Sequence, residues 1–251
     1  MSEGKSNWVS KYRVHSSNCN NKGIIRLSSI AKYLQEIAWE HAEYCGAGYH
    51  SLLPQGFLWI LYGLKIEISR FPVWNDSIEI ETWGKKYENL FAYRDFEVKD
   101  EKNKNPVIKA TSSWLMVDAK THRPQRITGR MHKIPEVEKY AIEEKPGEIK
   151  LPESYQKTRD IEVLFSDIDI YNHVNNTSYI QYCVNSSREL QENLQEVKSF
   201  NIRFVQECHL GDELVIMYER KQNSFHFLGK KKKNGREVFR AGVELKKVQS
   251  L

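Results

Sequence analysis

The sequence predicts an α+β protein made of two similar halves, each with one strand, one long helix and then four strands. Most of its regular segments alternate apolar and polar residues, which is typical of strands. Only two long segments, 28–44 and 176–190, have the spacing of a helix with one apolar face. The order of elements repeats after roughly 130 to 150 residues, as an internal duplication would give.

The first half begins with a strand at 8–15 and a polar turn at 16–23. The helix at 28–44 follows, and we expect Gly46 and Gly48 to end it. Alternating segments then predict four strands, at 57–68, 77–83, 91–98 and 107–117.

The segment 119–157 is rich in Lys, Glu, Pro and Arg and has no sustained apolar period. It is longer than most loops inside a compact domain, so we interpret it as a connector. We therefore predict an N-terminal domain at 1–118, a connector at 119–157 and a C-terminal domain at 158–251.

The second half repeats the order of the first. A strand ends at Phe165, the helix spans 176–190, and Asn234-Gly235 predicts a type I′ turn in the last hairpin. The four later strands are predicted at 199–205, 213–220, 225–232 and 237–246.

Composition indicates a globular protein of 251 residues, with 40% apolar content and 12% aromatic residues. No run approaches the roughly 20 apolar residues of a membrane span, and neither a signal peptide nor a plastid leader is seen. We therefore expect a cytoplasmic enzyme of bacterial type, or a mature plastid form. The four cysteines are scattered without a C-x-x-C pair, which favours reduced, packed thiols and no metal site. Basic residues are interleaved with acids and no nucleic-acid motif is present, so a nucleic-acid partner is not expected.

Polar groups suited to chemistry gather in the stretch from Phe165 to Tyr182. Asp169 and His173 come just before the second helix, for which Asn175 or Asn176 is a good N-cap. A helix start offers backbone N–H groups and a positive dipole end that can stabilise an oxyanion. Asp and Asn also gather there simply as capping residues, so the residues alone leave both interpretations open.

The string Asp-x-x-x-His-Val-Asn-Asn-x-x-Tyr-Ile at 169–180 resembles the signature of the hotdog-fold thioesterases. Within that superfamily the chain is most similar to the acyl-acyl-carrier-protein thioesterases of plants and bacteria. Further stretches carry the resemblance along the chain, namely 34–36, 59–61, 65–68, 78–83, 91–96, 110–114 and 206–208. It implies a tandem (double) hotdog, two antiparallel sheets each wrapped around a long central helix. It also implies that the N-terminal hotdog binds the acyl chain and the C-terminal hotdog carries the catalytic residues.

By this resemblance, Asp169, His173 and Glu207 occupy catalytic positions. We assign Glu207 and His173 to polarising a water molecule, and Asp169 to orienting His173 or its neighbour; which carboxylate is the base stays open. Tyr171 stands where the plant enzymes carry Asn, and its hydroxyl cannot reproduce the paired donor and acceptor of an amide.

Two further residues are candidate contributors. Asn175 is more plausible as a cap than as a catalyst. Cys208 invites a thiol nucleophile with His173 as its base, although a buried structural cysteine is the commoner role for a lone Cys in a strand.

The internal repeat sharpens this assignment. Counting back from the helix starts places Lys22 and Arg26 opposite Asp169 and His173, and aligning Asp76 with Asp212 places Phe71 opposite Glu207. The first half therefore lacks the acid and the imidazole, which weakens a purely structural reason for them in the second half.

The resemblance implies a thioesterase that hydrolyses fatty acyl-acyl-carrier-protein and so ends fatty acid elongation, with no metal or organic cofactor. An acyl-CoA thioesterase and a non-catalytic acyl-binding or carrier-binding protein are the alternatives. The acyl slot would lie largely in the first half, with candidate walls at Trp59, Leu61, Trp83, Phe91 and Trp114.

The net charge of +5 suits an acidic partner such as acyl carrier protein. Two groups of basic residues are candidates for that contact, Arg123, Arg126 and Arg130, or Lys230 to Lys233. Two fused halves can supply what two hotdog protomers usually do, so a monomer and a homodimer both stay open.

Overall fold

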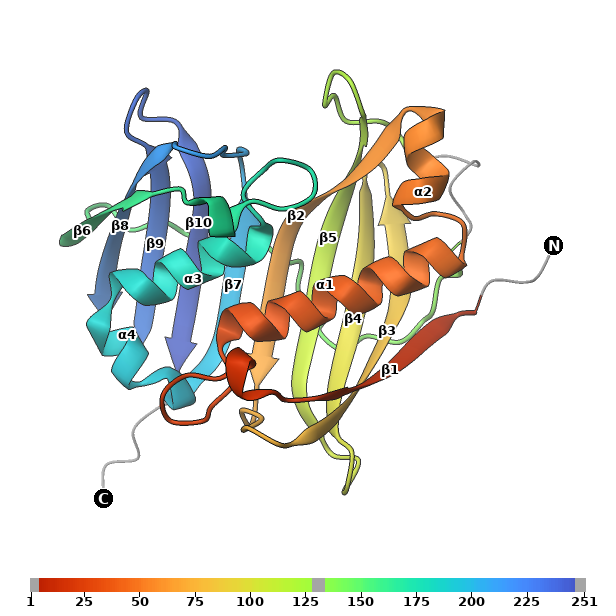
Figure 1. Ribbon diagram of the computed structural model, residues 1–251, viewed down its shortest axis with the longest axis horizontal. Helices are drawn as coiled ribbons and strands as arrows, with labels where there is room; N and C mark the ends of the chain where they lie inside the picture. Colours follow the sequence, from red (N-terminus) through yellow and green to blue (C-terminus); the bar gives the residue numbers. More distant parts are fainter. Residues whose placement is uncertain (1–4, 128–133, 247–251) are drawn as a thin grey trace. The chain divides into compact units, whose positions relative to one another are not determined.

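A computed structural model describes residues 5–127 and 134–246 of the chain (Figure 1). It divides into two compact units, Met1–Leu64 with Ser69–Lys145, and Lys65–Ile68 with Pro146–Leu251. The candidate basic residue Arg130 lies outside the described residues.

The first unit contains one long helix and a sheet with the strand order β1-β3-β4-β5-β2. The pairs β1–β3, β3–β4 and β4–β5 are antiparallel. Its elements are β1 (Asn7–Arg13), η1 (Ser16–Asn18), α1 (Leu27–Tyr44), α2 (Tyr49–Leu52), η2 (Leu53–Gln55), β2 (Phe57–Ile68), β3 (Ser77–Glu88), β4 (Phe91–Asp100) and β5 (Pro106–Asp118); the end of β2, Lys65–Ile68, is assigned to the second unit.

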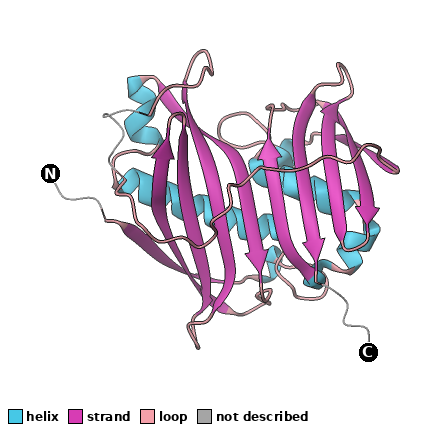
Figure 2. Cartoon of the chain, turned by 180° about the vertical axis from the view of Figure 1, so that it is seen from behind, coloured by secondary structure: helices cyan, strands magenta, loops and turns pink. Residues whose placement is uncertain are grey.

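The second unit repeats this plan with the strand order β6-β8-β9-β10-β7, and its strand pairs are antiparallel. In Figure 1, α1 lies across one face of the sheet of its unit, and α3 does the same in the other. Figure 2 shows the opposite faces of the same strands. The elements are β6 (Lys157–Glu162), η3 (Phe165–Asp167), α3 (Asn176–Ser186), α4 (Arg188–Glu192), η4 (Leu194–Glu196), β7 (Val197–Phe204), β8 (Glu213–Lys221), β9 (Ser224–Lys231) and β10 (Glu237–Leu245).

Helix α1 forms because apolar residues recur every three or four positions, and this face is buried from Leu27 to Ala42. It ends as the sequence predicts. Gly46 takes a left-handed φ of 65°, its N–H donates to the Glu43 carbonyl, and the Ala47 N–H donates to the Ala42 carbonyl. These two bonds satisfy carbonyls that would otherwise lack partners at the helix end. Within the described part of the chain, no helix is long and apolar enough to cross a membrane.

Three local predictions for the second unit are wrong. The helix predicted at 176–190 breaks at Ser187, whose side chain accepts the Leu190 N–H and starts a separate helix, α4. The strand expected to reach Phe165 ends at Glu162, and Phe165 begins the short helix η3. In the β9–β10 hairpin only Gly235 of the predicted pair has a positive φ, 68°, so the turn is not type I′.

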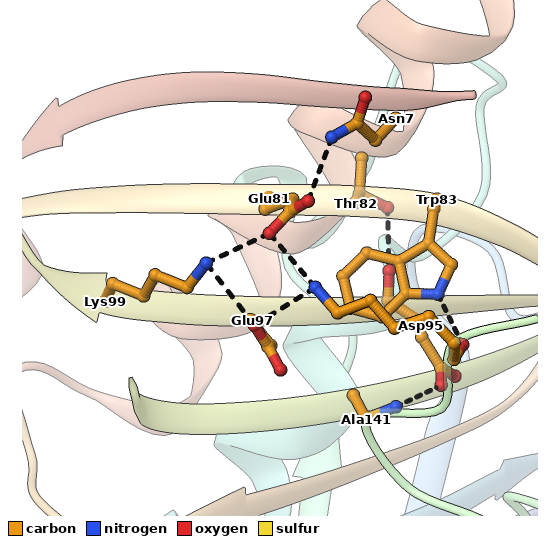
Figure 3. Close-up of polar contacts among 9 residues, drawn as sticks. Asn7, Glu81, Thr82, Trp83, Asp95, Glu97, Lys99 and Ala141 are labelled. Atoms are coloured by element: carbon orange, nitrogen blue, oxygen red, sulfur yellow. Dashed lines mark hydrogen bonds and ion pairs between the residues drawn. The ribbon is translucent and has the colours of Figure 1, made fainter. Parts of the chain in front are cut away.

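The connector is anchored to the first unit, a feature that its polar composition hid. The Trp83 indole N–H donates to the Lys139 carbonyl at 2.7 Å, and the Ala141 N–H donates to the Asp95 carboxylate at 2.7 Å (Figure 3). Lys85 completes the contact, because its ammonium lies 3.4 Å from Asp95 and donates to the Ile142 carbonyl at 2.5 Å. We call Trp83, Lys85, Asp95 and the segment 139–142 the connector anchor.

The connector anchor lies on the sheet face that points away from α1. Arg94 reaches His41 of α1 at 2.9 Å and donates to the Thr82 hydroxyl at 3.1 Å, so Arg94 and Thr82 face the helix. Neighbouring residues of a strand point to opposite faces, which places Trp83 and Asp95 on the other face.

Phe91 also points away from α1. It stacks on Tyr93, and Tyr93 points to the face opposite its neighbour Arg94. Trp83 and Phe91 therefore do not face α1. Trp114 bonds to Ser112 on the helix side, and Trp59 packs on the cluster of Leu52 and Met116.

Removing the ammonium of Lys85 should destabilise the protein strongly. Lys85→Ala leaves the buried Asp95 carboxylate without its cation, a change that typically costs about 3–5 kcal/mol of unfolding free energy. Urea denaturation measures the loss. Lys11→Ala is the matched control, since it removes the cation of an exposed pair with Glu101 and should leave the urea midpoint unchanged. Equal midpoints for the two variants would contradict the anchor.

Stability should fall as pH falls from about 6.5 to about 4, because His41 is fully buried. Burial, and next the Arg94 charge, lower the pKa of His41 to about 4, so the unfolded chain binds its proton first. This contribution is complete above the unfolded pKa and is lost toward the folded one, with a slope of up to about 1.4 kcal/mol per pH unit. His41→Gln should remove that part of the slope in urea titrations, while the exposed His50→Gln should keep it.

Candidate active site

The motif residues form a tight turn between η3 and α3. The Asp169 N–H donates to the His173 carbonyl at 2.8 Å, and the Asn172 N–H donates to the Asp169 carbonyl at 3.0 Å. Asn172 has a left-handed φ of 62°, a conformation that Asn tolerates better than most residues. The Asp169 carboxylate accepts the Tyr171 N–H at 2.9 Å. The turn therefore fixes the backbone from which the His173 side chain projects.

The start of α3 follows at once, and the predicted cap is confirmed. The Asn175 side-chain oxygen accepts the Thr177 N–H at 2.9 Å and the Thr177 hydroxyl at 2.7 Å. The Asn175 N–H donates to the Asp167 carbonyl at 2.8 Å. Among the described residues, no protein group accepts the Asn176 N–H. That donor remains for a ligand, at the positive end of the helix.

A backbone hydrogen bond brings the second loop of the site to the motif. The Val174 N–H donates to the Cys208 carbonyl at 2.9 Å, which places their preceding neighbours side by side. The His173 Nε2 lies 3.5 Å from the Glu207 Oε2, with side chains 26% and 36% exposed. An imidazole and a carboxylate in this arrangement can share a proton and still meet solvent or substrate.

The structure brings His173 and Glu207 together. Asp169 is joined to His173 through the backbone, and its carboxylate accepts the Tyr171 N–H. Tyr171 is half-buried in the same turn. Asn175 acts as the cap of α3.

Cys208 is fully buried behind this site. Burial raises the pKa of its thiol, against the opposing effects of the Tyr179 hydroxyl and Lys231. A nucleophilic cysteine needs a thiolate and access to substrate, so this geometry does not favour the nucleophile interpretation.

His209 is a residue of the site that the sequence reasoning missed. Its ring packs edge-to-face against His173, with centroids 4.8 Å apart and planes at 61°. Its Nδ1 lies 3.3 Å from the Asn172 carbonyl oxygen, and its backbone N–H donates to Asp212 at 2.9 Å. The only signal in the sequence was its position two residues after Glu207, because neighbours of the same parity share a face of an extended chain.

The first unit contains the same turn, which corrects the predicted alignment of the two halves. The Asn20 N–H donates to the Ile24 carbonyl at 2.8 Å, just as Asp169 donates to His173. Asn20 and Ile24, and not Lys22 and Arg26, are therefore the counterparts of Asp169 and His173. The error arose because Arg26 precedes α1 without a side-chain cap, which blurs the helix start in the sequence.

The predicted counterpart of Glu207 is correct. The Ile25 N–H donates to the Pro72 carbonyl at 3.1 Å, as Val174 donates to Cys208, so the preceding residue Phe71 matches Glu207. The first unit keeps the backbone of the site without its acid, its imidazole or its second carboxylate.

The turn itself does not require a carboxylate. The Asn20 side chain accepts the Lys22 N–H at 2.9 Å, the same bond that Asp169 makes to Tyr171. An amide therefore satisfies the turn in the first unit, and the negative charge of Asp169 needs another explanation. In the described ranges 5–127 and 134–246, no group of three or more His, Cys, Asp or Glu residues is placed to hold a metal ion.

Comparison with known families decides the classification. The sequence model of the acyl-ACP thioesterase N-terminal domain matches residues 5–134, and that of the C-terminal domain matches residues 151–249. The chain belongs to the acyl-ACP thioesterase family. The tandem hotdog fold predicted from the resemblance is confirmed by solved structures of this family.

Two of those solved structures cover nearly the whole chain. An acyl-ACP thioesterase from Bacteroides thetaiotaomicron is 28% identical with a TM-score of 0.87, and covers 98% of this chain and 100% of that one. The 12:0-ACP thioesterase from Umbellularia californica is 20% identical with a TM-score of 0.84, and covers 96% of this chain and 97% of that one. The similarity to the Umbellularia californica structure, at 20% identity, is evidence for the fold alone.

Curated relatives come from plants. The chloroplastic palmitoyl-acyl carrier protein thioesterase of Cuphea hookeriana is 25% identical over 76% of this chain, and this chain spans about half (48%) of that protein. The chloroplastic oleoyl-acyl carrier protein thioesterase 2 of Arabidopsis thaliana is 25% identical over 100% of this chain and 79% of its own length.

The buried thiols give a direct test of the cysteine geometry. All four cysteines are free and buried, so the folded protein should react with a chromogenic disulfide reagent at pH 8 far more slowly than the unfolded protein. Four thiols should react at once in guanidinium. A native thiol that reacts within seconds, mapped to Cys208 by its loss in Cys208→Ala, would contradict the burial of that residue.

Proposed function

We propose that this chain hydrolyses the thioester of a fatty acyl-ACP and releases a free fatty acid and the carrier protein. The observation that supports this most is the His173–Glu207 pair, 3.5 Å apart, beside a helix start with an available N–H. Membership of the acyl-ACP thioesterase family supplies the substrate class.

The pair suits activation of water. Glu207 and His173 take the proton of a water molecule as its oxygen attacks the thioester carbonyl carbon. The negative charge that develops on the carbonyl oxygen meets the Asn176 N–H at the positive end of α3. When the C–S bond breaks, the imidazolium of His173 returns the proton to the departing thiolate, so that the enzyme regains its starting state.

Asp169 contributes its charge. The counterpart Asn20 makes the same turn bond with an amide, which supports assigning the carboxylate of Asp169 a role in the chemistry. A negative charge in the loop that carries His173 stabilises the imidazolium that forms during the reaction. Tyr171 and Asn175 support the backbone of the turn and of the helix start, and Cys208 packs behind them.

The partner in this proposal is an acidic acyl carrier protein. Arg123 and Arg126 are exposed in the first unit, and Lys233 is exposed in the second. Lys231 and Lys232 are already engaged in ion pairs with Asp212 and Asp160. Both groups of basic residues remain candidates for the contact with the carrier protein. In this proposal the first unit holds the acyl chain. Acyl-CoA is the alternative substrate, because the same groups would act on the same bond.

The decisive assay is thiol release from acyl-ACP and acyl-CoA that carry the same acyl chain, repeated over several chain lengths. Wild type should hydrolyse the carrier-protein substrate with the higher kcat/KM. His173→Ala and Glu207→Gln should lower kcat by about 10²- to 10⁴-fold, the range for loss of general acid–base catalysis. Asp169→Asn keeps the turn and should lower kcat by about 10²-fold through its lost charge.

Matched controls separate chemistry from folding. Asn20→Asp places the second-unit residue at the matching position of the first unit and should leave kcat unchanged. Cys208→Ala should change kcat by less than about tenfold, because its thiol is not the nucleophile. Each variant must keep the thermal midpoint of wild type to within a few degrees. If wild type releases no thiol from either substrate, the hydrolase proposal is wrong. If folded His173→Ala keeps full activity, the assignment of the active site is wrong.

A further inference from the structure

We propose that His209 is a positioning residue for the reaction, holding the imidazole of His173 in the orientation that meets Glu207. This inference rests on the proposed function of the site. His209 contacts the turn and the catalytic imidazole and has no assigned contact with the thioester.

Three contacts lock His209 in place. Its backbone N–H donates to the Asp212 carboxylate at 2.9 Å, and Asp212 is itself held by Lys231 at 2.7 Å. Its Nδ1 lies 3.3 Å from the Asn172 carbonyl oxygen, and its ring lies edge-to-face on His173. One side chain therefore supports both the turn before His173 and the ring of His173.

The corresponding positions of the first unit hold apolar residues and a backbone bond in place of the His209 contacts. There the Gly23 carbonyl, the counterpart of the Asn172 carbonyl, accepts the backbone N–H of Trp74 at 2.8 Å. Val73 is the counterpart of His209, because its N–H donates to Asp76 at 3.0 Å as His209 does to Asp212. Val73 pairs with Ile24, so the apolar pair Ile24 and Val73 becomes the pair His173 and His209 in the unit that holds the site.

The carbonyl contact decides the tautomer of His209. A carbonyl oxygen can only accept, so the Nδ1 of His209 carries a proton and the Nε2 is the nitrogen that gains or loses one. With its Nδ1–H held on this carbonyl, the ring of His209 keeps one orientation against His173.

The other charges that face this pair are known from the contacts. Glu207 faces His173 from the same loop as His209, and Asp169 lies across the turn. Asp212 faces the His209 backbone and is neutralised by Lys231 of β9. All four remain in His209 variants, so a change in kcat reports the loss of His209 itself.

Two variants separate ring packing from hydrogen bonding. His209→Phe keeps an aromatic ring against His173 but removes the Nδ1 donor and the charge. His209→Asn keeps a donor near the Nδ1 position but removes the ring. His50→Asn, at an exposed histidine of the first unit, is the control and should behave as wild type.

The measurement is kcat and KM across pH 5 to 9 with an acyl-ACP substrate. His209→Asn should lower the plateau kcat by roughly 5- to 10-fold with KM unchanged, the loss that a misaligned proton-transfer group gives. His209→Phe keeps a ring against His173 and should retain more of the wild-type kcat than His209→Asn does. A folded His209→Asn with wild-type kcat would overturn the proposal, and so would a rise in KM alone.

A second measurement is independent of activity. NMR spectra of the histidine ring protons, with His173 assigned through His173→Asn, should show the His173 signals displaced in His209→Asn, because the ring that lies edge-to-face on His173 is gone. His50→Asn should leave those signals in place. If wild type releases no thiol, the proposed function fails while these spectra still test the histidine pair. Unchanged His173 signals in His209→Asn would overturn the positioning contact whatever the activity.

Discussion

The backbone hydrogen bond from the Val174 N–H to the Cys208 carbonyl connects the two loops that carry the candidate active site of the second unit. It joins two loops that are more than 30 residues apart in the sequence and fixes their register to one residue. A shift by one position would turn Glu207 away from His173, because successive residues of an extended chain point to opposite sides. The Glu207–His173 contact, the packing of His209 and the burial of Cys208 all follow from that register.

The first unit keeps this constraint and omits the chemistry. Ile25 bonds to Pro72 as Val174 bonds to Cys208, and Gly23 takes the left-handed turn position that Asn172 takes in the second unit. Glycine adopts that conformation without strain and Asn tolerates it better than most residues, so both sequences close the same turn. The duplicated scaffold is thus a built-in comparison, in which side chains present only in the second unit are the ones that need a functional explanation.

Periodicity in the sequence was enough for the order of elements, and the resemblance to a known family implied the tandem hotdog and the candidate residues His173 and Glu207. Those features are local, or repeat with the period of a helix or a strand. The sequence could not reveal His209, because its role depends on a nonlocal backbone bond and on the orientation of a ring. The alignment to Lys22 and Arg26 failed for a related reason, since α1 starts without a side-chain cap and its first residue cannot be located by capping rules. The break at Ser187 was missed because its hydroxyl competes with the backbone of a continuous helix.

The connector is polar, yet it covers one face of the sheet of the first unit and so affects which side chains that face can bury. Its carbonyls and N–H groups at 139–142 satisfy Trp83, Lys85 and Asp95, polar groups that would be costly to bury without partners. That coverage lets the sheet of the first unit bury aromatic residues on its second face as well as under α1. Alternation of side chains then divides the tryptophans between the two faces, with Trp114 on the face of Arg94 and Trp83 beneath the connector. Trp114 and the buried cation Arg94 therefore share the face toward α1, while Trp83 and Phe91 lie on the other face.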